Sequence, residues 1–271
     1  MSMLGPYASY NKETGYAVQI HPTAEYTGIF ERLNIQPKGV IHVGMWDFCE
    51  MFCYAKLVGD KVIGVEANPT TYQYMAKPVA DKWQVKSFNE CVSDVDDKDT
   101  TFYFLGEGSS LYQGQPQWNR NSGIEVKTKT LSTLIEENDI DMNQYDFLNI
   151  DVEGSELDVL KGFEKYLSYI NVIDMETSLN DRHIAGADHQ TIASWLSERG
   201  FEIREMSSSY QNEGWGDSVF VRIDKRHDIF KNVNCGDEVW GKGYLENHCS
   251  FQTSGTQQLH WQNNTPGFVA L

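Results

Sequence analysis

The chain has 271 residues, of which 22 are Lys or Arg and 39 are Asp or Glu, so its formal net charge at pH 7 is −17. Nucleic-acid backbones and anionic membrane surfaces both attract basic proteins, so this balance argues against either partner. No apolar run reaches the roughly 18–20 residues of a membrane-spanning helix. Residues 1–10 also lack the basic and apolar regions of a signal peptide. Five cysteines, an odd count, favour reduced thiols, so we expect a cytoplasmic protein.

Strand-like and helix-like segments alternate between about residues 39 and 223. Short apolar runs predict buried strands, and the longer amphipathic stretches predict helices. The predicted strands are residues 39–44, 61–65, 83–92, 101–105, 125–130, 145–152, 170–175, 201–206 and 218–223. The predicted helices are residues 47–57, with Asp47 as N-cap, 69–79, 131–137, 155–166 and 189–199. This alternation predicts an α/β fold, with a mostly parallel sheet, helices on both faces and a closing antiparallel pair.

Two extensions flank this predicted domain of residues 38–225. Residues 1–37 are of mixed composition and are expected to contain a helix near residues 24–33. Residues 226–271 are rich in Asn, Gln and Gly but carry six large aromatic side chains, whereas disordered tails are usually poor in aromatics. We therefore expect an ordered, irregular C-terminal extension that serves as a lid or a contact in a homo-oligomer.

A first candidate site combines Gly44, at the end of the first predicted strand, with Glu66, at the end of the second. A glycine there lets a ligand approach the backbone, and an acid about 20 residues later suits the two hydroxyls of a ribose. The later glycines of a dinucleotide fingerprint are absent after Gly44. This disfavours NAD, which has a pyrophosphate, and favours S-adenosylmethionine (SAM), which has none. His42 lies within the strand and is expected at the core or the pocket floor.

A second candidate site is the segment Asn149–Glu156, which holds three carboxylates at a strand-to-helix junction. Helix capping alone accounts for Ser155 and Glu156. It does not account for Asp151, which directly follows an apolar strand, where a carboxylate is unfavourable without a partner. Asp151 is therefore predicted to face a ligand.

The segment Leu148–Gly162 closely resembles the signature of FkbM-type methyltransferases. Other blocks of that family follow the same order in this chain. They are Ile41–Gly44 with Glu50 and Tyr54, Gly64–Pro69, Cys91–Asp94, Ser109–Leu111, Glu176–Thr177 and Gly216–Asp217. The resemblance spans about residues 38–223 and departs from the family at Trp46 and Phe48, which are larger than usual in the first turn. They could crowd the cofactor or line a modified pocket.

The resemblance implies a Rossmann-like, seven-stranded class I methyltransferase fold and SAM as cofactor. It implies that Gly44 and the following turn contact the methionine part of SAM, that Glu66 binds the ribose, and that Asp151 and Glu153 lie near the amino group. The implied cofactor-binding residues are His42, Gly44, Met45, Trp46, Asp47, Glu66, Ala67, Asn68, Cys91, Ser110, Asp151 and Glu153.

Methyl transfer to a hydroxyl needs a group that takes the proton. The candidates are the acids and histidines that follow the fourth and fifth strands of the methyltransferase sheet. His183 is the predicted base, and Asp151 and Glu176 are the other predicted catalytic residues. Asp151 and Glu176 could instead share Mg²⁺; this is not favoured, because the Asp-Asn pair of metal-dependent relatives does not follow the fifth strand. Aromatic residues in loops could stack on a sugar or cover the core: Tyr112, Trp118, Tyr210 and Trp215.

The sequence therefore predicts an O-methyltransferase that modifies a hydroxyl of a small molecule or glycan, foremost a sugar or glycoconjugate. Two alternatives remain open. One is a methyltransferase-like binding or assembly module without catalysis. The other is a ribose 2′-O-methyltransferase acting on nucleic acid, which the net charge of −17 disfavours.

Overall fold

A computed structural model describes residues 35–106, 108–113, 122–178, 186–206 and 215–223, with Phe30, Leu33 and the backbone of four short terminal strands. Those strands form two antiparallel pairs, β1 (Ala8–Tyr10) with β2 (Ala17–Gln19), and β13 (Leu259–Trp261) with β14 (Phe268–Ala270). The rest of the predicted C-terminal extension, and most of the predicted N-terminal helix, lie outside the described residues. The division of the chain into three parts stays a prediction.

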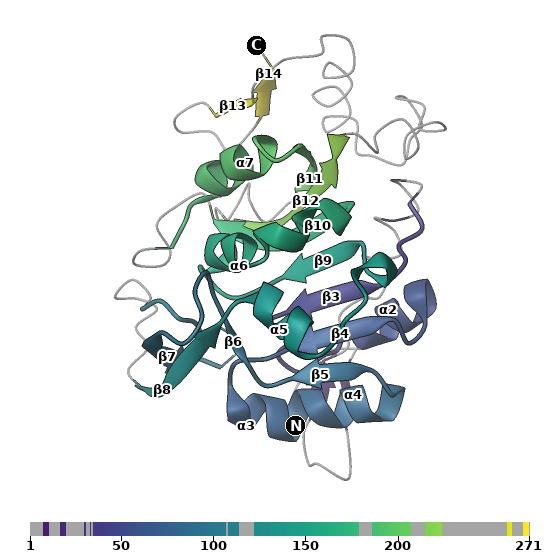
Figure 1. The fold of residues 1–271 in the computed structure, drawn as a ribbon, viewed down its shortest axis with the longest axis vertical. Coiled ribbons are helices and arrows are strands. Elements are labelled where there is room, and N and C mark those ends of the chain that lie inside the picture. Colours follow the sequence, from purple (N-terminus) through teal and green to yellow (C-terminus); the bar gives the residue numbers. More distant parts are fainter. Residues whose placement is uncertain are drawn as a thin grey trace.

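Seven strands form one sheet in the order β11–β12–β10–β9–β3–β4–β5, from top to bottom in Figure 1. Their bounds are β3 (Val40–Val43), β4 (Val62–Val65), β5 (Lys86–Phe88), β9 (Phe147–Ile150), β10 (Val172–Ser178), β11 (Phe201–Met206) and β12 (Trp215–Arg222). Strands β10, β9, β3, β4 and β5 are parallel, whereas β12 is antiparallel to β10 and β11. The predicted seven-stranded α/β fold and its closing antiparallel pair are confirmed.

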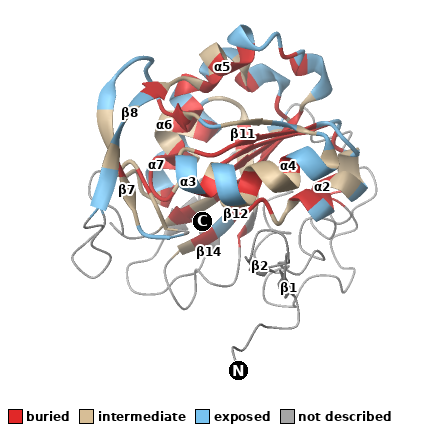
Figure 2. Ribbon diagram, turned by 90° about the horizontal axis from the view of Figure 1, so that it is seen from below, coloured by how far each residue is buried: buried red, intermediate tan, exposed pale blue. Residues whose placement is uncertain are grey.

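Helices cover both faces of the sheet, so the strands are buried between them (Figure 2). One layer comprises α5 (Leu131–Glu137), α6 (Glu156–Gly162) and α7 (His189–Ser197), and the other comprises α2 (Met51–Val58) with the continuous helix α3 (Pro69–Thr71), η1 (Tyr72–Ala76) and α4 (Lys77–Trp83). Strand side chains alternate between the layers. In β3, Ile41 and Val43 pack in the core with α5, α6 and α7, whereas Val40 packs in the core with α2 and α4.

A polar row crosses the sheet on the side that α2 covers. His42 of β3 is the register partner of Asn149 on β9, which is in turn the partner of Asp174 on β10. All three side chains are buried. Asn149 donates from Nδ2 to the hydroxyl of Tyr54 on α2 at 2.6 Å, and that hydroxyl lies 3.3 Å from Nδ1 of His42. Burial lowers the pKa of His42 to about 3, so the ring is neutral.

Two predicted strands do not join the central sheet. β7 (Asp99–Phe104) and β8 (Ser122–Lys129) form an antiparallel pair, and β8 also pairs in parallel with β6 (Cys91–Val92). The single strand predicted over 83–92 is interrupted, because Asn89 donates from Nδ2 to the carbonyls of Glu66 and Ala67 and turns the chain. The interruption separates β5 in the central sheet from β6 in a three-stranded sheet beside it.

Three predicted helices have different boundaries. The helix predicted over 69–79 continues to Trp83, where a strand was predicted to begin. α2 begins at Met51 rather than near Asp47, because Trp46 and Phe48 have positive φ of 43° and 60°, which is incompatible with a helix. Asp47 is therefore not the N-cap. The α-helix predicted over 155–166 ends at Gly162, and the 3₁₀-helix η4 (Glu164–Tyr169) follows it. Another 3₁₀-helix, η3 (Met142–Gln144), precedes β9.

Within the described part of the chain, no helix has both the length and the apolar character to cross a membrane.

Candidate functional site: a pocket at the carboxyl ends of the parallel strands

A pocket opens at the carboxyl ends of β3, β4 and β9, the edge at which open parallel sheets bind their ligands. Its empty volume, with the open mouth included, is about 490 Å³. The residues that line it are Val43, Gly44, Trp46, Val65, Glu66, Ala67, Glu90, Cys91, Val92, Phe102, Ser109, Leu111, Asp151, Val152 and Ser155. Six of the predicted cofactor-binding residues are among them: Gly44, Trp46, Glu66, Ala67, Cys91 and Asp151.

Gly44 is required by a close contact between the ends of β3 and β9. Its φ is +87°, and a Cβ at this position would lie 1.7 Å from the carbonyl oxygen of Asp151. The contact is fixed by backbone hydrogen bonds, since Asp151 donates to Val43 and Gly44 donates to Val65, both at 2.9 Å. No side chain fits between these strand ends.

The turn after Gly44 sends its large side chains in two directions. Met45 and Phe48 are fully buried in the core with α2 and α4, where Gly64 leaves room for them; a Cβ at Gly64 would lie 2.3 Å from Sδ of Met45. Trp46, in contrast, lines the pocket. The expectation that Phe48 crowds the cofactor is therefore corrected: its ring belongs to the core.

Glu66 connects the turns that follow β3 and β4. Its Oε2 accepts from the backbone N–H of Trp46 at 2.9 Å, and its Oε1 accepts from that of Asn68 at 2.7 Å. The side chain is buried beside the pocket, and this burial raises the pKa of Glu66 to about 7 although the two backbone donors oppose the shift. Each carboxylate oxygen keeps a second lone pair with which it can accept from a ligand.

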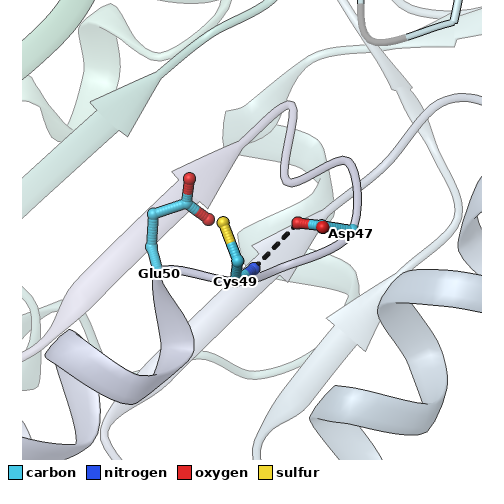
Figure 3. A group of neighbouring side chains, drawn as sticks. All are labelled: Asp47, Cys49 and Glu50. Carbon is cyan, nitrogen blue, oxygen red and sulfur yellow. Dashed lines mark hydrogen bonds between the residues drawn. The ribbon is translucent and has the colours of Figure 1, made fainter. Parts of the chain in front are cut away.

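Asp47, Cys49 and Glu50 form a small group in the same turn (Figure 3). One potential ligand atom from each lies within 4.8 Å of the others. Oδ1 of Asp47 accepts from the backbone N–H of Cys49 at 3.0 Å, which is the turn geometry that Asp favours. This contact gives Asp47 a structural role in the turn, and none of the three lines the pocket.

The acidic segment after β9 holds the second group of carboxylates. Asp151 lines the pocket, and its side chain is exposed there. One carboxylate oxygen each from Asp151, Glu153 and Glu176 lie within 4.8 Å of one another, so Glu176, at the end of β10, joins the group as predicted from its position. Desolvation by the surrounding protein, and then repulsion from Glu176 and Glu153, raise the pKa of Asp151 well above its usual range.

The backbone of this segment is held in an unusual conformation. Glu153 has a left-handed φ of 58° and Gly154 a φ of 110°. For a residue with a Cβ this conformation costs on the order of 1 kcal/mol. Oε1 of Glu156 accepts from the N–H of Gly154 at 2.8 Å, and Ser155, at the N-cap of α6, makes no side-chain capping hydrogen bond. Glu156 therefore supports the turn, in place of the Ser155 cap that the sequence suggests.

Several predicted cofactor-binding side chains lie outside the pocket lining. Asn68 caps α3 by accepting from the N–H groups of Thr70 and Thr71, and Ser110 is fully buried and donates to the carbonyl of Glu153. The others outside the lining are His42, Met45, Asp47 and Glu153. The predicted base His183, and the aromatic residues Trp118 and Tyr210, lie outside the described residues.

Sequence reasoning missed part of the pocket wall. Glu90, Phe102 and Leu111 line it, and Glu90 pairs with Lys129 on β8 at 2.8 Å. Phe102 and Leu111 belong to the three-stranded sheet and its loop, which sequence alternation did not connect with the central strands. The alternation around Ser110 was an available signal, because neighbours on either side of a buried residue face the other way.

The family model described as a methyltransferase FkbM domain matches residues 36–203. No curated protein matches the chain. Solved structures that resemble it include a precorrin-6y C5,15-methyltransferase from Geobacter metallireducens GS-15, with 11% identity, coverage of 78% of this chain and 95% of that one, and a TM-score of 0.43. A SAM-dependent methyltransferase from Aquifex aeolicus has 12% identity, coverage of 75% and 94%, and a TM-score of 0.41. Magnesium protoporphyrin IX methyltransferase from Synechocystis PCC 6803, with bound SAM, has 12% identity, coverage of 74% of this chain and 79% of that one, and a TM-score of 0.39.

Proposed function

The chain belongs to the FkbM methyltransferase family, and from this premise we propose that it transfers the methyl group of SAM to a hydroxyl of a sugar or glycoconjugate. The observation that supports SAM best is the charge of the pocket. Among the described residues that line it, Glu66, Glu90 and Asp151 are acidic, and none is Lys, Arg or His.

This lining fits the charge of SAM. The cofactor carries a sulfonium and an ammonium against one carboxylate, so it is a net cation, and carboxylates around it are favourable. A dinucleotide would bring a pyrophosphate, which needs basic groups or closely spaced backbone N–H groups.

In this proposal each part of the pocket binds one part of the cofactor. Glu66 accepts from the ribose hydroxyls while it holds the two turns through its backbone contacts. Ala67 and Cys91 border the adenine, and Phe102 adds an apolar surface beside them. Asp151 faces the amino group of the methionine part.

When bound, SAM supplies a methyl group on a positively charged sulfur, which leaves as a neutral thioether. The acceptor oxygen forms its bond to the methyl carbon, so its proton must pass to a base. We propose that the acidic group of Asp151 and Glu176 takes this proton, because desolvation, and then repulsion from Glu176 and Glu153, raise the affinity of Asp151 for a proton. His183 remains a second candidate for the base.

The same carboxylates provide the oxygen ligands that Mg²⁺ prefers, since one oxygen each from Asp151, Glu153 and Glu176 lie within 4.8 Å of one another. We favour a reaction without metal, in which the ammonium group of SAM lies beside this acidic group. Removal of divalent cations with a chelator separates the two versions.

Calorimetric titration with SAM, followed by transfer of a labelled methyl group to a panel of sugars and glycoconjugates, tests the proposal. We expect micromolar binding of SAM and labelling of a hydroxyl oxygen. Absence of binding at millimolar SAM would contradict the proposal. Binding of SAM with no transfer to any acceptor of the panel supports the alternative of a binding module without catalysis.

A further inference from the structure

The loop between β7 and β8 forms one wall of the pocket through alternate residues. Ser109 and Leu111 line the pocket, whereas Ser110 between them is fully buried. Backbone hydrogen bonds in both directions join Ser110 to Tyr103, with N···O distances of 3.0 and 2.8 Å. The wall is therefore attached to β7 at the residue whose side chain faces away from the pocket.

The side chain of Ser110 joins this wall to the acidic segment after β9. Its hydroxyl donates to the carbonyl oxygen of Glu153 at 2.7 Å and accepts from the backbone N–H of Tyr112 at 2.9 Å. A second attachment lies two residues later, where the hydroxyl of Tyr112 donates to the carboxylate of Asp158 on α6. Both attachments connect residues more than 40 positions apart in the chain.

The carbonyl that Ser110 holds belongs to the residue with the unusual backbone. Glu153 has a left-handed φ, and two residues before it Asp151 lines the pocket. A donor on the Glu153 carbonyl stabilises this conformation, because the peptide that follows Glu153 is oriented by it. One buried hydroxyl thus fixes the pocket wall at Leu111 and the position of the acidic segment together.

We infer that Ser110 is a positioning residue for the cofactor site: it holds the 108–113 loop and the acidic segment in the arrangement that binds SAM, and it does not contact SAM. Tyr112 supports it through Asp158. The identity of the ligand, SAM, rests on the proposed function. The coupling between the 108–113 loop and the acidic segment after β9 rests on the contacts of Ser110 alone.

The test compares Ser110→Ala with Thr101→Val as a matched control. Ser110→Ala removes both side-chain hydrogen bonds, whereas Thr101→Val removes one exposed hydrogen bond, to Glu125, within the same β7–β8 pair. Loss of buried hydrogen bonds predicts an increase of about tenfold in the SAM dissociation constant for Ser110→Ala. Thr101→Val is expected to leave it unchanged. Tyr112→Phe keeps the ring and is expected to raise the constant about threefold. If Ser110→Ala does not fold, the SAM dissociation constant of Tyr112→Phe tests the inference.

Two readouts separate positioning from a general loss of stability. Hydrogen exchange without ligand is expected to become faster at the Tyr112 amide and around Gly154 in Ser110→Ala, and to stay unchanged in helix α7. The SAM dissociation constant is expected to rise at a temperature well below the melting transition of the variant. Ser110→Cys, which keeps a weak donor of similar size, is expected to restore part of the affinity.

Unchanged exchange at the Tyr112 amide, or a SAM dissociation constant within twofold of the parent in folded Ser110→Ala and Tyr112→Phe, overturns the inference. If the parent protein binds no SAM at all, the proposed function fails. The exchange experiment then still decides whether Ser110 couples the wall to the acidic segment.

Discussion

The turn after β3 and the turn after β9 meet at the same pocket, but they use their residues in opposite ways. The first turn places Met45 and Phe48 in the core and offers the pocket its backbone at Gly44 and the side chain of Trp46. The second keeps its carboxylates at or near the pocket, and buries the backbone contacts that hold them. Both contain left-handed residues other than glycine, Trp46 and Phe48 in one and Glu153 in the other.

The difference indicates that the first turn determines the shape of the pocket and the second determines its charge. The first turn determines how closely a ligand can approach the sheet, so its tolerance to substitution depends on volume. The second determines the electrostatic potential of the pocket, so its tolerance depends on ionisation. Substitutions that act on one property and not the other can test this division.

The largest effect is expected for Gly44→Ala. A Cβ at Gly44 would lie 1.7 Å from the carbonyl oxygen of Asp151, so the ends of β3 and β9 must separate. We expect a loss of about 3 kcal/mol or more in the free energy of unfolding, together with loss of SAM binding. Gly59→Ala is the matched control, because Gly59 also has a positive φ, of 69°, but a Cβ there would meet no other atom within 4 Å. It should cost only about 1 kcal/mol in urea denaturation; equal losses for the two variants would refute the volume argument.

Glu66→Gln tests the acid that connects the two turns after β3 and β4. Loss of charge-assisted hydrogen bonds to the ribose should weaken SAM binding by about 1.5–3 kcal/mol, measured by calorimetry. Glu137→Gln, an exposed change in an ion pair with Lys129, is the control and should leave SAM binding unaltered. A change below about 0.3 kcal/mol in folded Glu66→Gln would remove Glu66 from the site.

The raised pKa of Glu66 also predicts how the stability of this variant depends on pH. The folded protein keeps a proton on Glu66 up to a pKa of about 7, whereas the unfolded chain releases it near 4.5. The parent protein therefore loses stability from this group as pH rises between these values, and Gln has no proton to lose. The free energy of unfolding of Glu66→Gln, relative to the parent, should increase by roughly 3 kcal/mol between pH 4.5 and 8. A constant difference across this range would show that Glu66 ionises normally.

Asp151→Asn separates the ammonium of SAM from Mg²⁺ as the partner of the acidic segment. With the ammonium as partner, the variant should bind SAM about fivefold more weakly, and EDTA should leave the rate of methyl transfer unchanged. With Mg²⁺ as partner, EDTA should abolish transfer and leave SAM binding nearly intact, and Glu176→Gln should behave like Asp151→Asn. Unaltered SAM affinity and unaltered turnover in folded Asp151→Asn would exclude both partners.

The smallest effect is expected at the start of α6. Ser155 occupies the N-cap without a side-chain capping hydrogen bond, whereas Thr130 caps α5 by accepting from the N–H of Thr133 at 3.1 Å. Thr130→Ala should lower the free energy of unfolding by about 1 kcal/mol, and Ser155→Ala by less than about 0.5 kcal/mol. Thermal unfolding of the two variants decides the order, and a larger loss at Ser155 would contradict the assigned caps.

The central sheet was predictable from sequence because its strands are apolar runs bounded by turn residues. Val40–Val43 and Phe147–Ile150 are buried on both faces and read as continuous apolar strands apart from His42 and Asn149. The positions of Gly44, Glu66 and Asp151 at the pocket also follow from the rule that ligands bind at the carboxyl ends of parallel strands.

The three-stranded sheet and the direction of individual side chains were not predictable in this way. Pairing of β6 with β8 joins residues that are far apart in the chain, which no local pattern encodes. Ser110 and Asn68 were expected at the cofactor because they lie in blocks that resemble the family, but a polar side chain next to a site can bind the backbone instead. Likewise, Phe48 reached the core through a positive φ that aromatic residues rarely adopt.

The polar row of His42, Asn149 and Asp174 has a consequence for how the sheet finds its alignment. Parallel strands of Val and Ile can slide past one another by two residues and still keep the same faces buried. In the native alignment the three polar groups lie side by side on β3, β9 and β10, within reach of Tyr54 on α2. A slip of β9 by two residues toward the strand starts would set Asn149 beside Val40 and Val172, where burial of its amide is unfavourable. The row thus discriminates against misaligned strands during folding, a task that an entirely apolar sheet centre could not perform.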